Sequence, residues 1–226
     1  MNNKNNKGIG RVLVNEIAWL AVLFAVVGAA VSSRYLTGLP DTRWWQYLYV
    51  LGASAGVFFI GHFLLQLLLV LPLALLSHRI GRVVACGLTF ILLVALVTDT
   101  FVYQQYRFHI NWAMIDLVLV GGREVFSFPV AMMIRIMFLI CFLGILTTIL
   151  VWGASKIKAK ALWSCFAILF CYLNVNLVNA YSVAQNVKSV TILAERVPLY
   201  FPIRANTLLS KFGLVVLQDD QINYSN

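Results

Sequence analysis

Five apolar runs constrain this sequence more than any other feature. Each is about as long as, or longer than, the roughly 20 residues that a helix needs to cross the hydrocarbon core of a bilayer. With 62% hydrophobic and 11% charged residues among 226, the composition excludes an ordinary soluble domain. The sequence therefore predicts an all-α, polytopic membrane protein with five transmembrane helices and short interfacial helices. The expected transmembrane domain is 1–182, with spans at about 12–31, 48–76, 83–103, 128–152 and 162–182.

The first apolar run also resembles a signal peptide, because Gly-Ala-Ala at 28–30 could form a cleavage site. That run is long for a signal peptide, and four further spans follow it. We therefore expect an uncleaved first span.

Lysine and arginine are unevenly divided between the short segments that join the spans. Eight lie in the N-terminus and in the segments 77–82 and 154–160, against four on the other side. The positive-inside rule then places the N-terminus in the cytoplasm and the tail, 183–226, on the opposite side. The net charge of +9 is thus largely a signal of topology, and nucleic acid is not an expected partner.

The centre of the chain holds an aromatic and basic cluster. Asp99 closes an apolar run and Arg107 follows it, surrounded by Phe101, Tyr103, Tyr106 and Phe108. Aromatic rings at the headgroup level beside a cation are typical of a helix that leaves the bilayer. Residues 104–127 are expected to continue as an amphipathic segment on the membrane surface.

Two charges inside the spans, Asp99 and Arg135, are expected to form a structural ion pair. Ionisable groups at membrane depth are costly and are usually paired. Both residues lie within roughly 10 Å of the same membrane face, at 1.5 Å of rise per residue. A proton or ion pathway is the alternative, although it would need a longer relay of polar groups.

A Gly-x-Ser-x-Gly motif at 52–56 matches the nucleophile elbow of serine hydrolases. It lies within an apolar helix, and the nearest histidine, His62, is roughly 12 Å further along that helix. The same small residues let two membrane helices approach closely. The motif therefore favours helix packing, and no catalytic residue is expected.

The remaining polar and sulfur-containing residues of the spans have ordinary interpretations. The four cysteines form no CxxC pair and are interpreted as small hydrophobic core residues, so neither a disulfide framework nor a metal site is expected. Asn174, Asn176 and Asn179 decorate the fifth span, where asparagine usually bonds to a neighbouring helix. A polar ligand cavity is the alternative for these asparagines.

The tail contains a pattern for a short amphipathic helix at about 203–212. Pro202 suits a helix start and Gly213 a helix stop. An apolar stripe (Ala205, Leu208, Leu209, Phe212) and a polar face (Arg204, Thr207, Lys211) alternate at helical spacing. Such a helix lies in the membrane interface, and its N-terminal amides with Arg204 suit a phosphate. A plain docking helix fits the pattern equally well.

Three stretches carry a resemblance to a known family. They are Ser33-Arg34-Tyr35-Leu36, Asp99 to Asn111 with His109, and Pro198 to Leu214. The chain resembles the membrane domain of the YejM (PbgA, LapC) family of Gram-negative inner-membrane proteins over nearly its whole length. The resemblance implies five membrane helices and a periplasmic linker, followed in the family by a large sulfatase-like domain. That domain is not expected here, because the chain stops at Asn226.

The resemblance also implies a function, that of a non-enzymatic lipopolysaccharide sensor without a cofactor. In this interpretation the linker binds the lipid A phosphates, and the membrane domain contacts LapB, the adaptor through which FtsH degrades LpxC. The family has a basic pair where this chain has Asn206 and Thr207. Arg204 and Lys211 are expected to replace that pair, with Arg34 and Arg107 completing the lipid site.

Two other functions remain open from the sequence. The chain could be the membrane anchor of a phosphoglycerol or phosphoethanolamine transferase of the alkaline-phosphatase superfamily. A small transporter is the third interpretation, weakened because the spans show no repeats and no series of polar residues. The sequence also leaves a homo-oligomer open.

Overall fold

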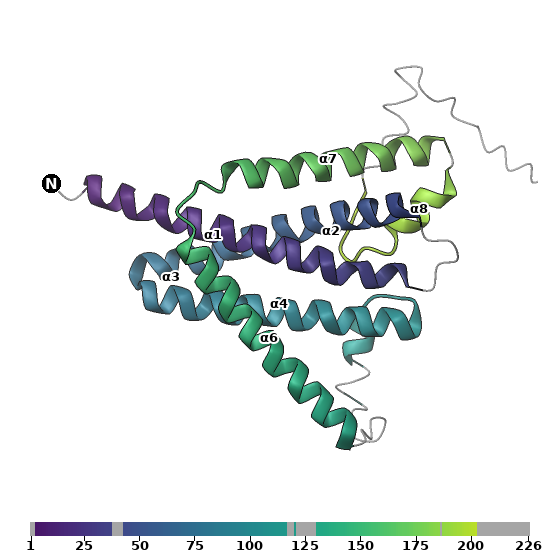
Figure 1. Ribbon diagram of the computed structural model, residues 1–226, viewed down its shortest axis with the longest axis horizontal. Coiled ribbons are helices and arrows are strands. Elements are labelled where there is room, and N and C mark those ends of the chain that lie inside the picture. Colours follow the sequence, from purple (N-terminus) through teal and green to yellow (C-terminus); the bar gives the residue numbers. More distant parts are fainter. Residues whose placement is uncertain (1–2, 38–42, 117–119, 121–129, 186, 203–226) are drawn as a thin grey trace, which may run out of the picture.

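A computed structural model of the chain describes residues 3–37, 43–116, 120, 130–185 and 187–202. This part of the chain is helical and contains no strand, and Figure 1 shows its helices gathered into a bundle. In chain order they are α1 (Asn3–Ser32), the 3-10 helix η1 (Ser33–Leu36), α2 (Trp44–Leu65), the π-helix η2 (Gln66–Val70), α3 (Leu71–Leu76), α4 (His78–Tyr106), α6 (Val130–Lys156), α7 (Leu162–Ala184) and α8 (Lys188–Ala194). Five segments are long and apolar enough to cross a membrane, which confirms the predicted number: Val12–Leu36, Trp44–Leu76, His78–Tyr106, Val130–Lys156 and Leu162–Val183.

Helix α1 is the centre of the bundle and packs against α2, α4, α6 and α7 (Figure 1). In its most apolar window 56% of residues are buried, against 17% in α6 and in α7. The fully buried Ala21 and Ala25 explain this position, because small residues let neighbouring helices approach closely. The bundle has two ends, named here the α3 end, where α3 meets α4, and the α8 end, where η1, α8 and the end of α4 lie.

The Gly-x-Ser-x-Gly segment packs α2 against α7, as the helix-packing interpretation predicted. A Cβ atom added at Gly52 would lie 2.9 Å from Val175, and one at Gly56 would lie 2.2 Å from Tyr172. Ser54 between them is fully buried. A larger residue would therefore push the two helices apart.

Among the three asparagines of α7, Asn179 bonds to a neighbouring helix. Tyr49 of α2 donates its hydroxyl hydrogen to Asn179 Oδ1 at 3.0 Å. Asn174 and Asn176 each donate to a carbonyl one turn earlier in α7. The predicted role of asparagine between helices is thus confirmed at Asn179.

The second span is one long helical element that changes its winding in the middle. At η2 the Leu71 amide donates to Gln66 O, the i to i+5 bond of a π turn. Pro72 follows directly and cannot donate a backbone hydrogen bond. After α3 only Ser77 separates the two helices, and the chain reverses because Gly81 lies against Ala74, where a Cβ atom would come within 2.4 Å.

Helix α6 diverges from the bundle toward its first residue (Figure 1). Its buried residues, Leu143, Thr147, Leu150 and Ala154, all lie in its second half. The first half faces outward, including Arg135. The prediction that all four cysteines are core residues is wrong, since Cys141 and Cys171 are exposed; they face outward as apolar residues of a membrane helix can.

The first part of the predicted linker packs on the bundle. Val190, Leu193 and Ala194 of α8, followed by Val197 and Tyr200, share a hydrophobic cluster with Val50 and Ala53 of α2 and Val175 of α7. Burial raises the pKa of the Tyr200 phenol. The linker is therefore anchored at least as far as Tyr200. The helix predicted at 203–212 lies outside the described residues.

Candidate functional site

A buried carboxylate, Asp99, organises the α8 end of the bundle. It is 7% exposed and accepts three hydrogen bonds. Tyr35 Oη donates to Asp99 Oδ2 at 2.6 Å, and the Ile110 amide donates to Oδ1 at 2.7 Å. His109 Nδ1 lies 2.7 Å from Oδ2, and it donates because a carboxylate only accepts. These groups, with Tyr103, are called the Asp99 cluster.

A backward turn of the chain brings these partners to Asp99. Helix α4 ends at Arg107, which has a left-handed backbone (φ 63°), and the Arg107 amide bonds to Tyr103 O at 2.9 Å. This conformation is costly for a residue with a side chain, so the surrounding contacts must hold it. The reversal returns His109 and Ile110 to the side of α4. Asn111 then caps a short helical segment at 112–116, its Oδ1 accepting from the Met114 amide at 3.0 Å.

Aromatic rings cover the Asp99 cluster. The Tyr103 ring stacks on His109, with ring centroids 4.7 Å apart and planes 25° from parallel. Tyr35 meets both rings edge-on, at 5.2 Å from each. Low local polarity strengthens the hydrogen bonds to the carboxylate and makes an unpaired group there expensive. The cluster is therefore a fixed joint between η1, α4 and the segment after α4.

Two arginines lie at the exposed rim of this joint. Arg34 donates to Gln104 Oε1 at 2.9 Å and stands over the Phe101 ring at 4.6 Å. Arg107 donates to Thr37 O at 3.0 Å. Gln104 also bonds to Thr37 Oγ1, at 3.3 Å, and so links the two arginines.

A third arginine reaches the same place from the linker. Arg196 donates to Tyr35 O at 3.1 Å and is half-buried. Arg34, Arg107 and Arg196 are called the arginine cluster. Each guanidinium uses only part of its five donors in these contacts, which leaves donors for an anion. The geometry thus gathers three cations from α1–η1, α4 and the linker at one end of the bundle.

The outcome for the predicted lipid-site residues is mixed. The structure brings Arg34 and Arg107 together, as their assignment to one site requires. Arg204, Asn206, Thr207 and Lys211 lie outside the described residues. Their proposed contact with a phosphate therefore stays a prediction.

The expected ion pair between Asp99 and Arg135 is not formed. Both residues belong to the described part of the chain, and its single ion pair at Asp99 is made with His109. Asp99 spends both oxygens on Tyr35, His109 and the Ile110 amide. Arg135 is exposed on the diverging half of α6. Similar depth along two helices does not predict contact between their side chains, because it leaves the lateral distance between the helices undetermined.

A large cavity adjoins the Asp99 cluster between α2 and α4, and is called the α2–α4 cavity. Its volume is about 540 Å³. Asp99, His109 and Leu199 line one end and His62 lines the other. Between them the wall is mostly apolar, with Phe24 of α1 among its residues. Volumes of about 300–1,000 Å³ with few polar groups are typical of ligand sites.

The inner end of this cavity is a second buried polar group of residues, the His62 cluster. His62 Nε2 lies 3.1 Å from Thr89 Oγ1, and Gln66 Nε2 lies 3.2 Å from the same oxygen. The His62 ring stacks on Phe24 at 4.3 Å. His62 Nδ1 and Gln66 Oε1 are buried without a hydrogen-bond partner in the described structure. Both residues come from the second span, one turn apart.

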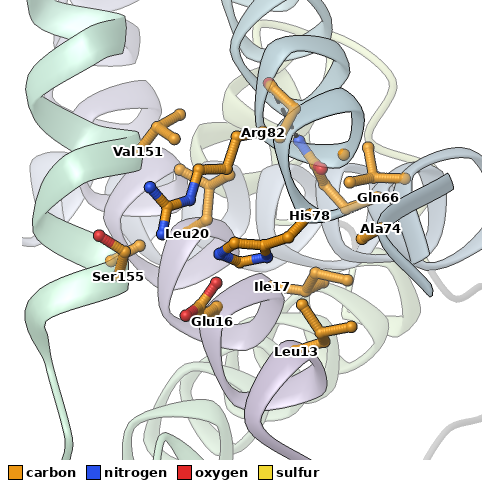
Figure 2. Close-up of a pocket in the computed structure, with 14 residues that line it drawn as sticks. Leu13, Glu16, Ile17, Leu20, Gln66, Ala74, His78, Arg82, Val151 and Ser155 are labelled. Carbon is orange, nitrogen blue, oxygen red and sulfur yellow. Dashed lines mark hydrogen bonds between the residues drawn. The ribbon is translucent and has the colours of Figure 1, made fainter. Parts of the chain in front are cut away.

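A small cavity lies on the far side of the His62 cluster, toward the α3 end. Its volume is about 40 Å³, and Gln66 forms part of its wall. Figure 2 shows Glu16 of α1 with His78 and Arg82 of α4 around the same space. Gln66 thus lines the small cavity while its neighbour His62 lines the large one.

Sequence reasoning missed several of these residues. From the sequence, His62 is weighed as a partner for Ser54, whereas His62 and Gln66 at a spacing of four form one polar face in an apolar helix. That spacing was the available signal. Arg196 carried no signal of its own, because its role depends on the linker folding back onto η1.

These features define an all-helical membrane domain with five spans, a basic cluster at one end and a cavity beside it. Residues 5–226 match the model of the family described as "Domain of unknown function (DUF3413)", and the chain belongs to that family. It is also similar to the "Inner membrane protein YejM" of Salmonella typhimurium (strain LT2) and of Salmonella typhi, with 23% identity over 225 residues in each case.

The match covers 90% of this chain and 36% of each Salmonella relative. The chain therefore spans about a third of the length of these curated relatives, and that third is their N-terminal membrane domain. The resemblance to the YejM family found in the sequence is confirmed.

Proposed function

We propose that this protein is a non-enzymatic sensor of lipopolysaccharide in the inner membrane. In the proposed orientation the α3 end faces the cytoplasm and the α8 end faces the periplasm, as the distribution of basic residues indicates. The arginine cluster then lies at the outer surface of the membrane. Lipid phosphates lie at the same depth as this cluster.

The arginine cluster is the observation that carries this proposal. Arg34, Arg107 and Arg196 are each held by a hydrogen bond to η1, to the residue after it or to α4. Fixed guanidinium groups are well suited to phosphate, because their planar forks bind its oxygens in pairs. The tail helix at 203–212, with Arg204 and Lys211, is proposed to add the remaining contacts.

The sensed lipid is proposed to control its own synthesis. Lipid bound at the periplasmic face would change the contact of the membrane domain with a LapB-type regulator, and so change the degradation of LpxC. The likeness to the YejM family supports this partner. The rigid joint at Asp99 supports a route by which lipid at the arginine cluster acts on α1 and α4.

The test is a lipopolysaccharide titration of the full chain in nanodiscs. Charge-assisted hydrogen bonds contribute about 1.5–3 kcal/mol each where solvent is partly excluded. Arg34 and Arg107 are exposed, which reduces that contribution. We therefore expect Arg34→Gln with Arg107→Gln to raise the Kd for lipopolysaccharide at least tenfold.

The matched control removes the same charge at the α3 end, with Arg79→Gln and Lys158→Gln, both exposed. This variant should bind lipopolysaccharide as the wild type does. Equal affinity of the two double variants would refute the arginine cluster as the lipid site.

A further inference from the structure

The α2–α4 cavity is not closed off by the helices that border it. Helix α4 meets the second span at η2, and α1 packs against both α2 and α4 (Figure 1). On the border of the cavity Gly61, Leu65 and Ala95 are exposed, so the wall between the two helices is incomplete. A cavity with this opening and an apolar lining is accessible to hydrocarbon from the bilayer.

The length of the cavity corresponds to one leaflet. From Val57 to Leu65 the α2 wall rises about 12 Å, at 1.5 Å per residue. Half of a hydrocarbon core of about 30 Å is about 15 Å. The cavity therefore begins at the α8 end, beside Asp99 and His109, and stops near mid-depth at the His62 cluster.

The mouth of the cavity has two features of a lipid site. Leu199 lines it, is 75% exposed and has a left-handed backbone with φ 58°. Strain of this kind in a residue other than glycine tends to occur at functional sites. Arg196 precedes Leu199 by three residues and bonds to Tyr35, the residue that contacts Asp99. An apolar entrance thus lies next to fixed cations, as an acyl chain with a phosphate requires.

We propose that the α2–α4 cavity holds one acyl chain of the lipopolysaccharide whose phosphate is bound by the arginine cluster. The inference rests on the proposed function for the identity of the lipid. It adds a second, apolar half to the site. The acyl chain of the lipid enters this half beside Leu199 and ends at His62. Binding of the lipid would then depend on its acyl chain as well as on its phosphate.

Two glycines provide a test that leaves the fold intact. A Cβ atom added at Gly61 or at Gly87 meets nothing within 4 Å, so a side chain can start from either position without a clash at Cβ. Gly61 lines the cavity, whereas Gly87 lies elsewhere, exposed on α4. We expect Gly61→Phe to weaken lipopolysaccharide binding in nanodiscs at least fivefold and Gly87→Phe to leave it unchanged. Equal affinities for the two variants would overturn the proposal.

Photo-crosslinking locates the acyl chain of the lipid directly. With benzoylphenylalanine in place of Ala95, ultraviolet light should attach lipopolysaccharide to the protein, and Gly61→Phe should suppress the adduct. The control position is Phe142, which is 60% exposed on α6 and lies outside the cavity. Adducts of equal yield at 95 and 142, or adducts at 95 with phospholipid alone, would overturn the proposal.

The two proposals fail in different ways. If Arg34→Gln with Arg107→Gln weakens binding while position 95 gives no more adduct than position 142, the phosphate site stands and the chain site is refuted. If the adduct at 95 persists in the arginine variant at the wild-type level, the chain site stands and the phosphate site is refuted.

Discussion

The two buried polar clusters of this protein differ in the acceptor that organises them. At the α8 end, Asp99 accepts from a hydroxyl, an imidazole and a backbone amide. Both clusters leave buried side-chain atoms without partners in the described structure: His109 Nε2 in the Asp99 cluster, and His62 Nδ1 and Gln66 Oε1 in the His62 cluster near mid-depth. A carboxylate that accepts three hydrogen bonds fixes its partners more strongly than side chains that share one hydroxyl oxygen.

The position of each cluster fits this difference. The Asp99 cluster joins three chain segments and supports the arginine cluster, so it needs a single arrangement. The His62 cluster separates two cavities, the larger of which is the proposed chain site. Its side chains can therefore respond to what fills that space. The three predictions below test whether the clusters differ in stability as they do in bonding.

Replacing Asp99 should have the largest effect. Asp99→Ala removes the acceptor for Tyr35, His109 and the Ile110 amide, and each buried group left without a partner costs about 1–3 kcal/mol. We expect the free energy of unfolding to fall by about 3–5 kcal/mol, measured by denaturant titration in detergent. Asp116→Ala, at an exposed position, is the control and should change little. A loss below about 1 kcal/mol would mean that the joint is not fixed by Asp99.

Replacing His62 should have a smaller effect. His62→Leu keeps an apolar side chain beside Phe24, and Gln66 and Thr89 retain their bond to each other. A single hydrogen bond contributes about 0.5–1.5 kcal/mol, so the same titration should show a loss of about 1 kcal/mol. A loss as large as that of Asp99→Ala would contradict the distinction drawn between the clusters. The matched control is His78→Leu, an exposed histidine at the α3 end.

Replacing Arg135 should have the smallest effect. Arg135 is exposed on α6, and exposed substitutions usually change stability by less than about 0.5 kcal/mol. Combined with Asp99→Ala, the variant Arg135→Gln should give a loss equal to the sum of the two single losses. Coupling of more than about 0.5 kcal/mol would restore the ion pair that the structure lacks.

The sequence predicted the fold well because span length and hydropathy are local properties. It also predicted the close packing at Gly52 and Gly56, since small residues at this spacing have one main use in membrane helices. It failed for Arg135 because the sequence gives depth along a helix but not the angle between helices. The cavity could not be predicted from the sequence for the same reason, since its volume depends on how α2 and α4 are placed relative to each other.

The Asp99 cluster was half predictable. Tyr35, Asp99 and His109 all belong to stretches that carried the family resemblance. Their contact depends on the left-handed backbone at Arg107. This conformation is usually adopted by glycine, and the residue here is not a glycine. A residue type that avoids this conformation gave no signal for the turn.

The π turn at η2 also decides which sides of the second span can face the rest of the protein. An i to i+5 bond takes one residue more than an α turn, so every later side chain is rotated by about 100° relative to an uninterrupted α-helix. Before the turn, Gly52 and Gly56 face α7. After it, Val70 and Ala74 are buried, and Ala74 meets Gly81 of α4. One extra residue thus lets a single span pack against α7 before the turn and against α4 after it. In an unbroken helix of the same length, the later contact residues would face another direction.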